Sequence, residues 1–152
     1  MPTEFDWARL AAFIDGEGMI DIHTRRQFSK KQNKIYECRY VRVEVVNTDP
    51  RLPLWCKNTF GGSIQPHKRY SSKWRMAYSW EIASKKAITI IRGCLPYFLL
   101  KREQAEIALA FQETVLRIGR GGHTQETLTL RANLQNKMKA LKHIEHPHIQ
   151  IN

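Results

Sequence analysis

The chain has 152 residues, of which 42% are hydrophobic, and its 25 Lys and Arg against 14 Asp and Glu give a formal charge of +11. This length predicts a single folded domain spanning 1–152, and the charge predicts a polyanionic partner such as nucleic acid, although a basic ribosomal-type protein would share it. No apolar run approaches the roughly 20 residues of a membrane span and the first residues do not resemble a signal peptide, so we expect no membrane partner and an intracellular, soluble protein in cytoplasm or organelle.

The first predicted helix begins at a cap supplied by Thr3 or Asp6 and runs to Asp15. Its apolar residues recur at helical spacing, and Ala11 and Ala12 leave room for a second backbone to approach. Glycines at positions 16 and 18 end the helix, and Asp15 and Glu17 lie at this end, where exposed carbonyls favour cations. Two carboxylates there suit a divalent metal, although a core helix with a solvated acidic end explains residues 15–18 taken alone.

Alternating residues predict a first strand at about 20–25, a polar turn at 28–34 and a return strand at 35–47. In the return strand Val41, Val43 and Val45 share one face. The opposite face carries donors, acceptors and apolar groups: Tyr40, Arg42, Glu44 and Val46. Such a mixed face can read base edges in a major groove, and the alternative is an ordinary amphipathic strand facing water.

Asp49-Pro50 starts a second helix, buried through Leu52, Leu54, Trp55 and Phe60, that ends at residues 61–62. A second strand pair opens at Ile64, and Pro66 favours an edge position for it. Residues 66–73 form a basic hairpin tip. Two alternating sets follow: Trp74, Met76, Tyr78, Trp80 and Ile82 are predicted inward, and Arg75, Ala77 and Ser79 outward.

Ser84 is predicted to cap a third helix that Pro96 breaks, and a fourth helix runs from roughly Tyr97 to Leu116. A C-terminal extension, 119–152, contains a last helix over 124–141. Its inward residues are Leu130, Leu134, Met138 and Leu141, and its outward ones Arg131, Lys137, Lys139 and Lys142. Two antiparallel strand pairs with helices over their apolar face define an α+β fold. The cysteines at 38, 56 and 94 form no CxxC pair, which predicts free buried thiols.

The string from Leu10 to Gly18, LAAFIDGEG, resembles the LAGLIDADG motif of homing endonucleases and related RNA maturases. It matches at Leu10, Ala11, Ile14, Asp15 and Gly18, and Glu17 stands in place of the last Asp of the motif. The resemblance implies the αββαββα core of that family over about 3–112. It also implies an intron-encoded nuclease that makes metal-dependent double-strand breaks in a long, roughly palindromic DNA target.

The resemblance also implies an active site. Glu17, with the Gly16 carbonyl, takes the place of the family's ligands for Mg²⁺ or Mn²⁺. Lys101, in the segment from Leu95 to Ala105, takes the place of the active-site lysine, and Asn47 that of a polar residue ordering water. From the residues alone, Lys101 could equally be a solvated helix lysine and Asn47 a turn former.

A single motif carries one acidic ligand, so cutting both strands implies a homodimer, with Leu10, Ala11, Phe13 and Ile14 expected at its interface. Lysines near Lys30 and in the second hairpin tip would bind phosphates. The expected DNA-binding residues are Asp21, His23, Arg25, Tyr40, Arg42, Glu44, Val46, Gln65, His67, Lys68, Arg69, Lys73, Arg75 and Ser79. An RNA maturase or a non-catalytic DNA-binding regulator on the same fold is the alternative.

Overall fold

A computed structural model of the chain describes residues 1–67, 71–116, 122–144 and 146. Its elements, in order, are α1 (Glu4–Glu17), β1 (Gly18–Ser29), β2 (Lys34–Asn47), α2 (Arg51–Phe60), β3 (Ser63–His67), β4 (Ala77–Ala83), α3 (Ser84–Cys94), the 3₁₀ turn η1 (Leu95–Tyr97), α4 (Arg102–Leu116) and α5 (Gln125–Leu141). The predicted α+β class and the order of strands and helices are confirmed.

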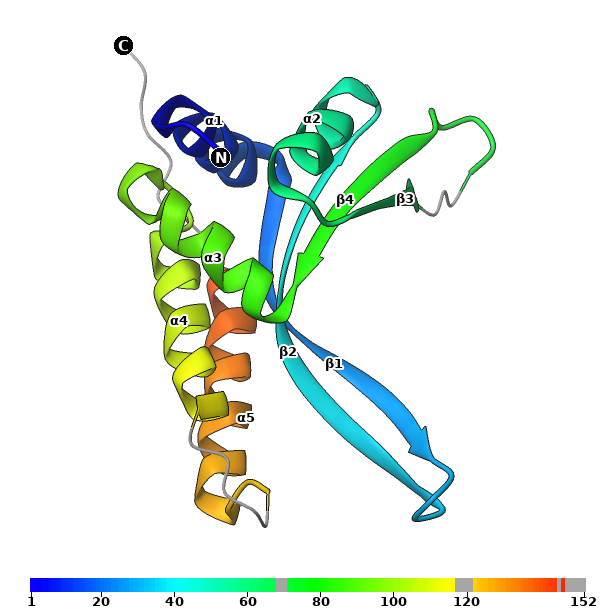
Figure 1. Cartoon of the computed structure of the whole chain (residues 1–152), viewed down its shortest axis with the longest axis vertical. Coiled ribbons are helices and arrows are strands. Elements are labelled where there is room, and N and C mark those ends of the chain that lie inside the picture. The colour runs from blue at the N-terminus through cyan, green and yellow to red at the C-terminus, as the bar shows by residue number, and fades with distance from the viewer. Residues whose placement is uncertain (68–70, 117–121, 145, 147–152) are drawn as a thin grey trace.

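The four strands form one antiparallel sheet in the order β1-β2-β4-β3. Val43 pairs with Ile82 and Val45 with Trp80, and all four side chains are buried beneath the helices. The sheet therefore has one core face and one outer face, as the alternation in β2 predicts. In Figure 1 the helices lie on one side of the sheet and its outer face looks the other way. Pro66 lies in the edge strand β3, as expected.

The first two strands continue well beyond the rest of the sheet. Pairing between β2 and β4 spans only Arg42 to Asn47, whereas the β1–β2 ladder extends out to Ser29 and Lys34. Residues 22–41 therefore form a two-stranded ribbon, here called the arm, which projects away from β3 and β4 (Figure 1). At its far end Phe28 and Ile35 are 60% and 62% exposed.

Several side-chain predictions are wrong. Trp74 and Met76 are exposed because β4 begins only at Ala77, so they lie in the turn before it. Leu54 is also exposed, and Pro53 and Cys56 are the buried residues of α2. In α5 two expectations are exchanged, since Leu130 is 43% exposed and Arg131 only 5%, whereas Met138 is buried and Lys137 and Lys139 are exposed as predicted.

Two helix starts also differ from the prediction. Ser84 is the first residue of α3 with a positive φ of 56°, and the helix has no side-chain cap. Helix α4 begins at Arg102 rather than near Tyr97, because Tyr97 ends η1, Phe98 is extended and residues 99–101 form a bend. All three cysteines are free, but only Cys56 and Cys94 are buried, since Cys38 lies on the exposed arm. Within the described ranges, no helix is both long and apolar enough to cross a bilayer.

Candidate active site

The end of α1 places Glu17 at the junction of helix and sheet. Thr3 and Asp6 form a reciprocal capping box that starts the helix. At the other end a Cβ on Gly18 would lie 2.6 Å from the Cα of Ile14, so only glycine lets β1 leave the helix so closely. The last turn contains no basic residue to offset the exposed carbonyls or the Glu17 carboxylate. This end of α1 is therefore a locally electronegative position.

Asn47, at the end of β2, contacts Glu17 directly. Its Nδ2 donates to Oε2 of Glu17, and its Oδ1 accepts the backbone N–H of Asp49 at 2.7 Å. Asp49 in turn binds the Arg51 guanidinium at 2.6 Å, and these hydrogen bonds lower the pKa of Asp49 to about 2. The Arg51 side chain is 88% exposed, so a held but accessible cation lies at the end of this chain of contacts. Arg51 is not among the site residues predicted from the sequence, although the Asp-x-Arg spacing of Asp49 and Arg51 is visible there.

Asp15 connects the end of α1 to the segment that carries Lys101. Its carboxylate accepts the backbone N–H groups of Leu99, Leu100 and Lys101 at 2.8, 3.2 and 3.0 Å. The Lys101 carbonyl accepts the first bond of α4, from Ala105, so Lys101 occupies the N-cap position of that helix. Asp15 accepts the N–H of this N-cap residue and of the two residues before it, so it holds in place the segment that leads into α4. Lys101 and Glu17 thus both flank the C-terminal end of α1.

The donors around Glu17 suit a hard divalent cation. They are oxygens: the exposed Glu17 carboxylate and the carbonyls of the last turn of α1, including that of Gly16. Such ligands fit Mg²⁺ or Mn²⁺, which commonly keep several waters and bind substrate phosphate oxygens. In the described part of the chain no group of three or more His, Cys, Asp or Glu residues could hold a metal ion.

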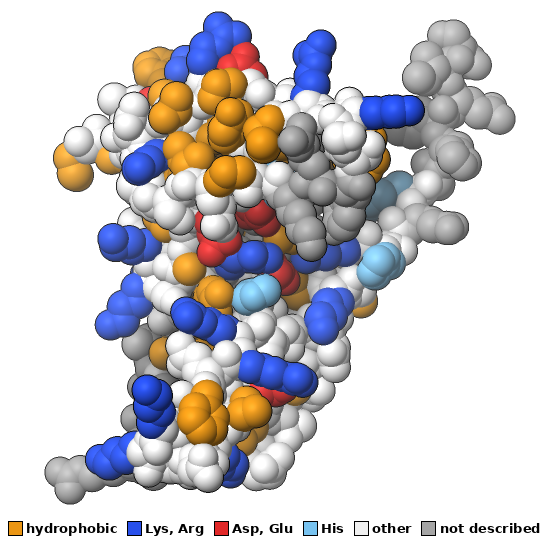
Figure 2. All heavy atoms as spheres, turned by 90° about the vertical axis from the view of Figure 1, so that its right-hand side faces the viewer, with side chains coloured by type: hydrophobic (Ala, Val, Ile, Leu, Met, Phe, Trp, Pro, Cys, Tyr) orange, Lys and Arg blue, Asp and Glu red, His pale blue; other side chains and the backbone are white. Residues whose placement is uncertain are grey.

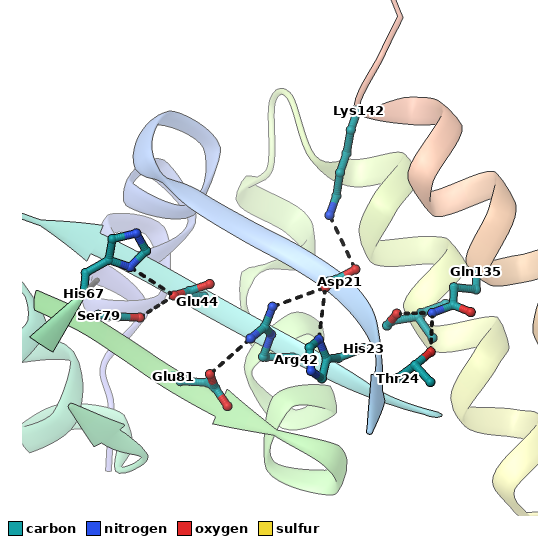
Figure 3. A network of polar contacts seen from close by, with 11 residues as sticks. Asp21, His23, Thr24, Arg42, Glu44, His67, Ser79, Glu81, Gln135 and Lys142 are labelled. Carbon is teal, nitrogen blue, oxygen red and sulfur yellow. Dashed lines mark hydrogen bonds and ion pairs between the residues drawn. The ribbon is translucent and has the colours of Figure 1, made fainter. Parts of the chain in front are cut away.

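The outer face of the sheet carries a network of charged groups (Figure 3). The guanidinium of Arg42 lies 3.3 Å from Asp21 and 3.4 Å from Glu81. Asp21 also lies 3.4 Å from Lys142, beyond α5, and Glu44 accepts a hydrogen bond from Ser79. Figure 2 shows acidic, basic and histidine side chains intermixed on this face, below a cluster of hydrophobic ones.

Most of the expected DNA-binding residues lie on this one face. Strand register places these side chains together: Asp21, His23, Arg25, Tyr40, Arg42, Glu44, Val46, Gln65, His67 and Ser79. Lys73 and Arg75 are exposed in the turn before β4, not on a strand, and Lys68 and Arg69 lie outside the described residues. Glu81 was missed, although its spacing of two from Ser79 predicts the same face.

The expected dimer interface needs correction. Leu10, Ala11 and Ile14 are 0% exposed and belong to the core of the single chain, so they cannot contact a second copy. Phe13 is partly buried and lies edge-on to Trp55. The exposed face of α1 instead presents Ala12 and Gly16, one turn apart, with nothing within 4 Å of a Cβ added to Gly16.

The fold is similar to that of several solved structures. No protein-family model matches the chain, and no curated protein sequence is significantly similar to it. The homing endonuclease I-CvuI, in complex with its target, superposes with a TM-score of 0.72 at 20% identity, over 96% of this chain and 87% of that one. The archaeal intron-encoded homing endonuclease I-Vdi141I, complexed with DNA, superposes with a TM-score of 0.69 at 12% identity, over 98% of this chain and 90% of that one.

A third structure, the I-SmaMI LAGLIDADG homing endonuclease bound to cleaved DNA, matches with a TM-score of 0.62 and 21% identity. The match covers 100% of this chain but 52% of I-SmaMI, so the chain corresponds to about half of that protein. The chain therefore has the fold of the LAGLIDADG homing endonucleases.

Proposed function

We propose that the protein is a site-specific, metal-dependent DNA endonuclease that acts as a homodimer. The observation that carries this proposal is that Glu17 with its partner Asn47, and the backbone of Lys101 held by Asp15, all lie at the C-terminal end of α1, where the chain enters the sheet. A protein that only bound nucleic acid would not need an uncompensated carboxylate at a helix C-terminus. The fold shared with DNA-bound homing endonucleases supports the same conclusion.

Each residue has a distinct role in this proposal. Glu17 and the Gly16 carbonyl would hold a divalent cation, which activates water and offsets phosphate charge when bound. Asn47 orients the Glu17 carboxylate through its amide. Lys101 provides a cation for the charge that develops on the scissile phosphate. Arg51, held by Asp49 and largely exposed, supplies a second cation near the same place.

A second copy of the chain would complete the site. Cleavage of both strands needs two reaction centres, and one chain contains one Glu17. The α1 residues Ala8, Ala12 and Gly16 recur every four positions on the side of the helix away from the core, so two such helices could pack with their backbones close together. The match of this chain to about half of I-SmaMI supports the pairing of two copies. A two-fold axis would make the target roughly palindromic.

The charges on the outer face favour base reading over simple phosphate binding. The face carries Asp21, Glu44 and Glu81 at its centre although the chain as a whole has a charge of +11. Carboxylates repel phosphate but accept hydrogen bonds from the cytosine amino group, and Arg42 can donate to guanine. A passive basic protein would have no use for acids there. We therefore place base discrimination on the sheet and phosphate contacts on the exposed lysines and arginines around it.

The decisive test compares Glu17→Gln with Glu113→Gln, a control at an exposed position on α4. Duplexes that bind the wild-type chain are selected from a random library and then incubated with Mg²⁺. We expect double-strand cleavage by the wild type and the control, and intact binding with at least a 100-fold slower rate for Glu17→Gln. Binding without cleavage by the wild type would favour the non-catalytic regulator. Cleavage by Glu17→Gln at the wild-type rate would refute the assigned metal ligand.

A further inference from the structure

Helix α5 forms hydrogen bonds with the base of the arm, where the arm leaves the four-stranded sheet. Gln135 is 8% exposed, and its Nε2 donates to the Ile22 carbonyl of β1 at 2.8 Å and to Oγ1 of Thr24 at 2.8 Å. Its Oε1 accepts the Nε–H of Arg39, on β2, at 3.0 Å. One side chain of α5 therefore bonds both strands of the arm (Figure 3 shows its contact with Thr24).

Arg131, one turn earlier on α5, makes the second attachment. Its guanidinium donates to the Arg39 carbonyl at 2.9 Å and to Oγ1 of Thr114 on α4 at 2.9 Å, and it lies 4.2 Å from the centre of the Phe111 ring. No acidic side chain forms an ion pair with it in the described part of the chain. The Arg39 carbonyl lies beyond the last β2–β4 pair, where β4 supplies no backbone donor. Arg131 supplies a side-chain donor to this carbonyl instead.

This network stabilises the packing of α5 less than apolar side chains would, because its polar groups lose their hydration. Burying a guanidinium without a counter-ion costs free energy that an apolar side chain would not, as Met138 on the same helix illustrates. A fully bonded buried polar network instead specifies one geometry, because each donor and acceptor must meet its partner. What Arg131 and Gln135 specify here is the position of the arm relative to α4 and α5.

The arm makes such control necessary. Its far end lies seven residues beyond Ile22, about 23 Å at roughly 3.3 Å per residue. A change of about 10° at the base would therefore move the end by roughly 4 Å, more than the ~3.4 Å rise of one DNA base pair. A two-stranded ribbon has little stability of its own to prevent this motion.

We infer that Arg131 and Gln135 are positioning residues that set the direction of the arm, so that its outer side chains, such as Arg25, meet the flank of the DNA target. This inference rests on the proposed DNA binding. It assigns a function to the C-terminal helix, for which the sequence offered none. The residues act through Arg39, Ile22 and Thr24, and they touch no DNA themselves.

The first experiment needs no DNA. Amide hydrogen exchange is measured for Gln135→Leu and Arg131→Met, with Met138→Ala as a control that removes buried apolar contacts from the same helix at a residue that makes none of these hydrogen bonds. We expect arm amides to exchange at least tenfold faster in the network variants, relative to core amides of β2 and β4, and the control to accelerate exchange in both regions alike. Equal acceleration of arm and core in Gln135→Leu and in the control would overturn the inference.

The second experiment is a double-mutant cycle on a selected duplex. In the wild-type background Arg25→Ala should weaken binding several-fold and reduce the salt dependence by about one phosphate contact. In the Gln135→Leu background the effect of Arg25→Ala should shrink at least threefold, and in the Met138→Ala background it should persist. The same loss in all three backgrounds would refute the positioning role. A wild type that binds no duplex would refute the proposed function, and the exchange experiment would still decide the grip of α5 on the arm.

Discussion

Asp15 is the residue whose replacement best tests how the candidate active site is built. From the end of α1 it holds the segment that leads into α4, through three backbone N–H groups that include that of Lys101. We expect Asp15→Asn to disturb Lys101 while leaving Glu17 and its contact with Asn47 in place. The amide keeps one acceptor and presents a donor where the carboxylate accepted, so at least one N–H loses its partner.

The magnitude follows from the geometry. Each hydrogen bond contributes about 1 kcal/mol net, and the N–H groups of Leu99 and Leu100 are exposed and can bind water instead. The loss in free energy of unfolding for Asp15→Asn should therefore be about 1–2 kcal/mol, the contribution of one or two such hydrogen bonds. Chemical denaturation measures this loss. The single-turnover cleavage rate should fall far more than stability implies, by roughly 100-fold, because a shift of about 1 Å in a catalytic group has that effect.

Two controls separate positioning from general destabilisation. Thr124→Ala removes the cap of α5, where Oγ1 accepts the N–H of Thr127, and should cost about 1 kcal/mol without changing the cleavage rate. In a Lys101→Ala background Asp15→Asn should slow cleavage little further, because both changes act through the same lysine. An unchanged denaturation midpoint, or full additivity of the two rate effects, would refute this account of Asp15.

Two other predictions concern the exposed face of α1 and the thiols. Gly16→Leu should leave the single chain at least as stable, since the space around Gly16 is open and glycine is a poor helix former. The leucine should nevertheless block close pairing of two α1 helices, so sedimentation should show a monomer where the wild type is a dimer. A dimer of unchanged affinity would contradict the pairing of α1. Burial raises the pKa of Cys56 and of Cys94 to about 12. At pH 8 a thiol reagent should therefore modify only the exposed Cys38 rapidly, and the other two cysteines only after unfolding. Rapid reaction of all three in the folded chain would contradict the placement of Cys56 and Cys94 in the core.

Local periodicity determined much of the fold. The alternation of valines in β2 predicted its buried face because a strand exposes every second side chain to the same environment. The residues from Leu10 to Gly18 carry the motif, and their glycines predicted that the helix ends close to Glu17, where α1 does end. Prediction failed where the pattern was interpreted as extending past the true end of an element, as at Trp74 and Met76.

Only the tertiary structure decided which side of each helix meets the core and which distant groups meet. Leu10 and Ala12 could each have faced a partner, and the sheet decided that Leu10 is buried and Ala12 exposed. Leu130 and Arg131 exchange their expected places because a carbonyl of β2 at the base of the arm needs a donor, which leucine lacks. Asp15 and Lys101 are 86 residues apart, and no local rule relates them. The sequence alone thus determined the strand faces and the motif, whereas the partners of Asp15, Arg131 and Gln135 depended on long-range packing.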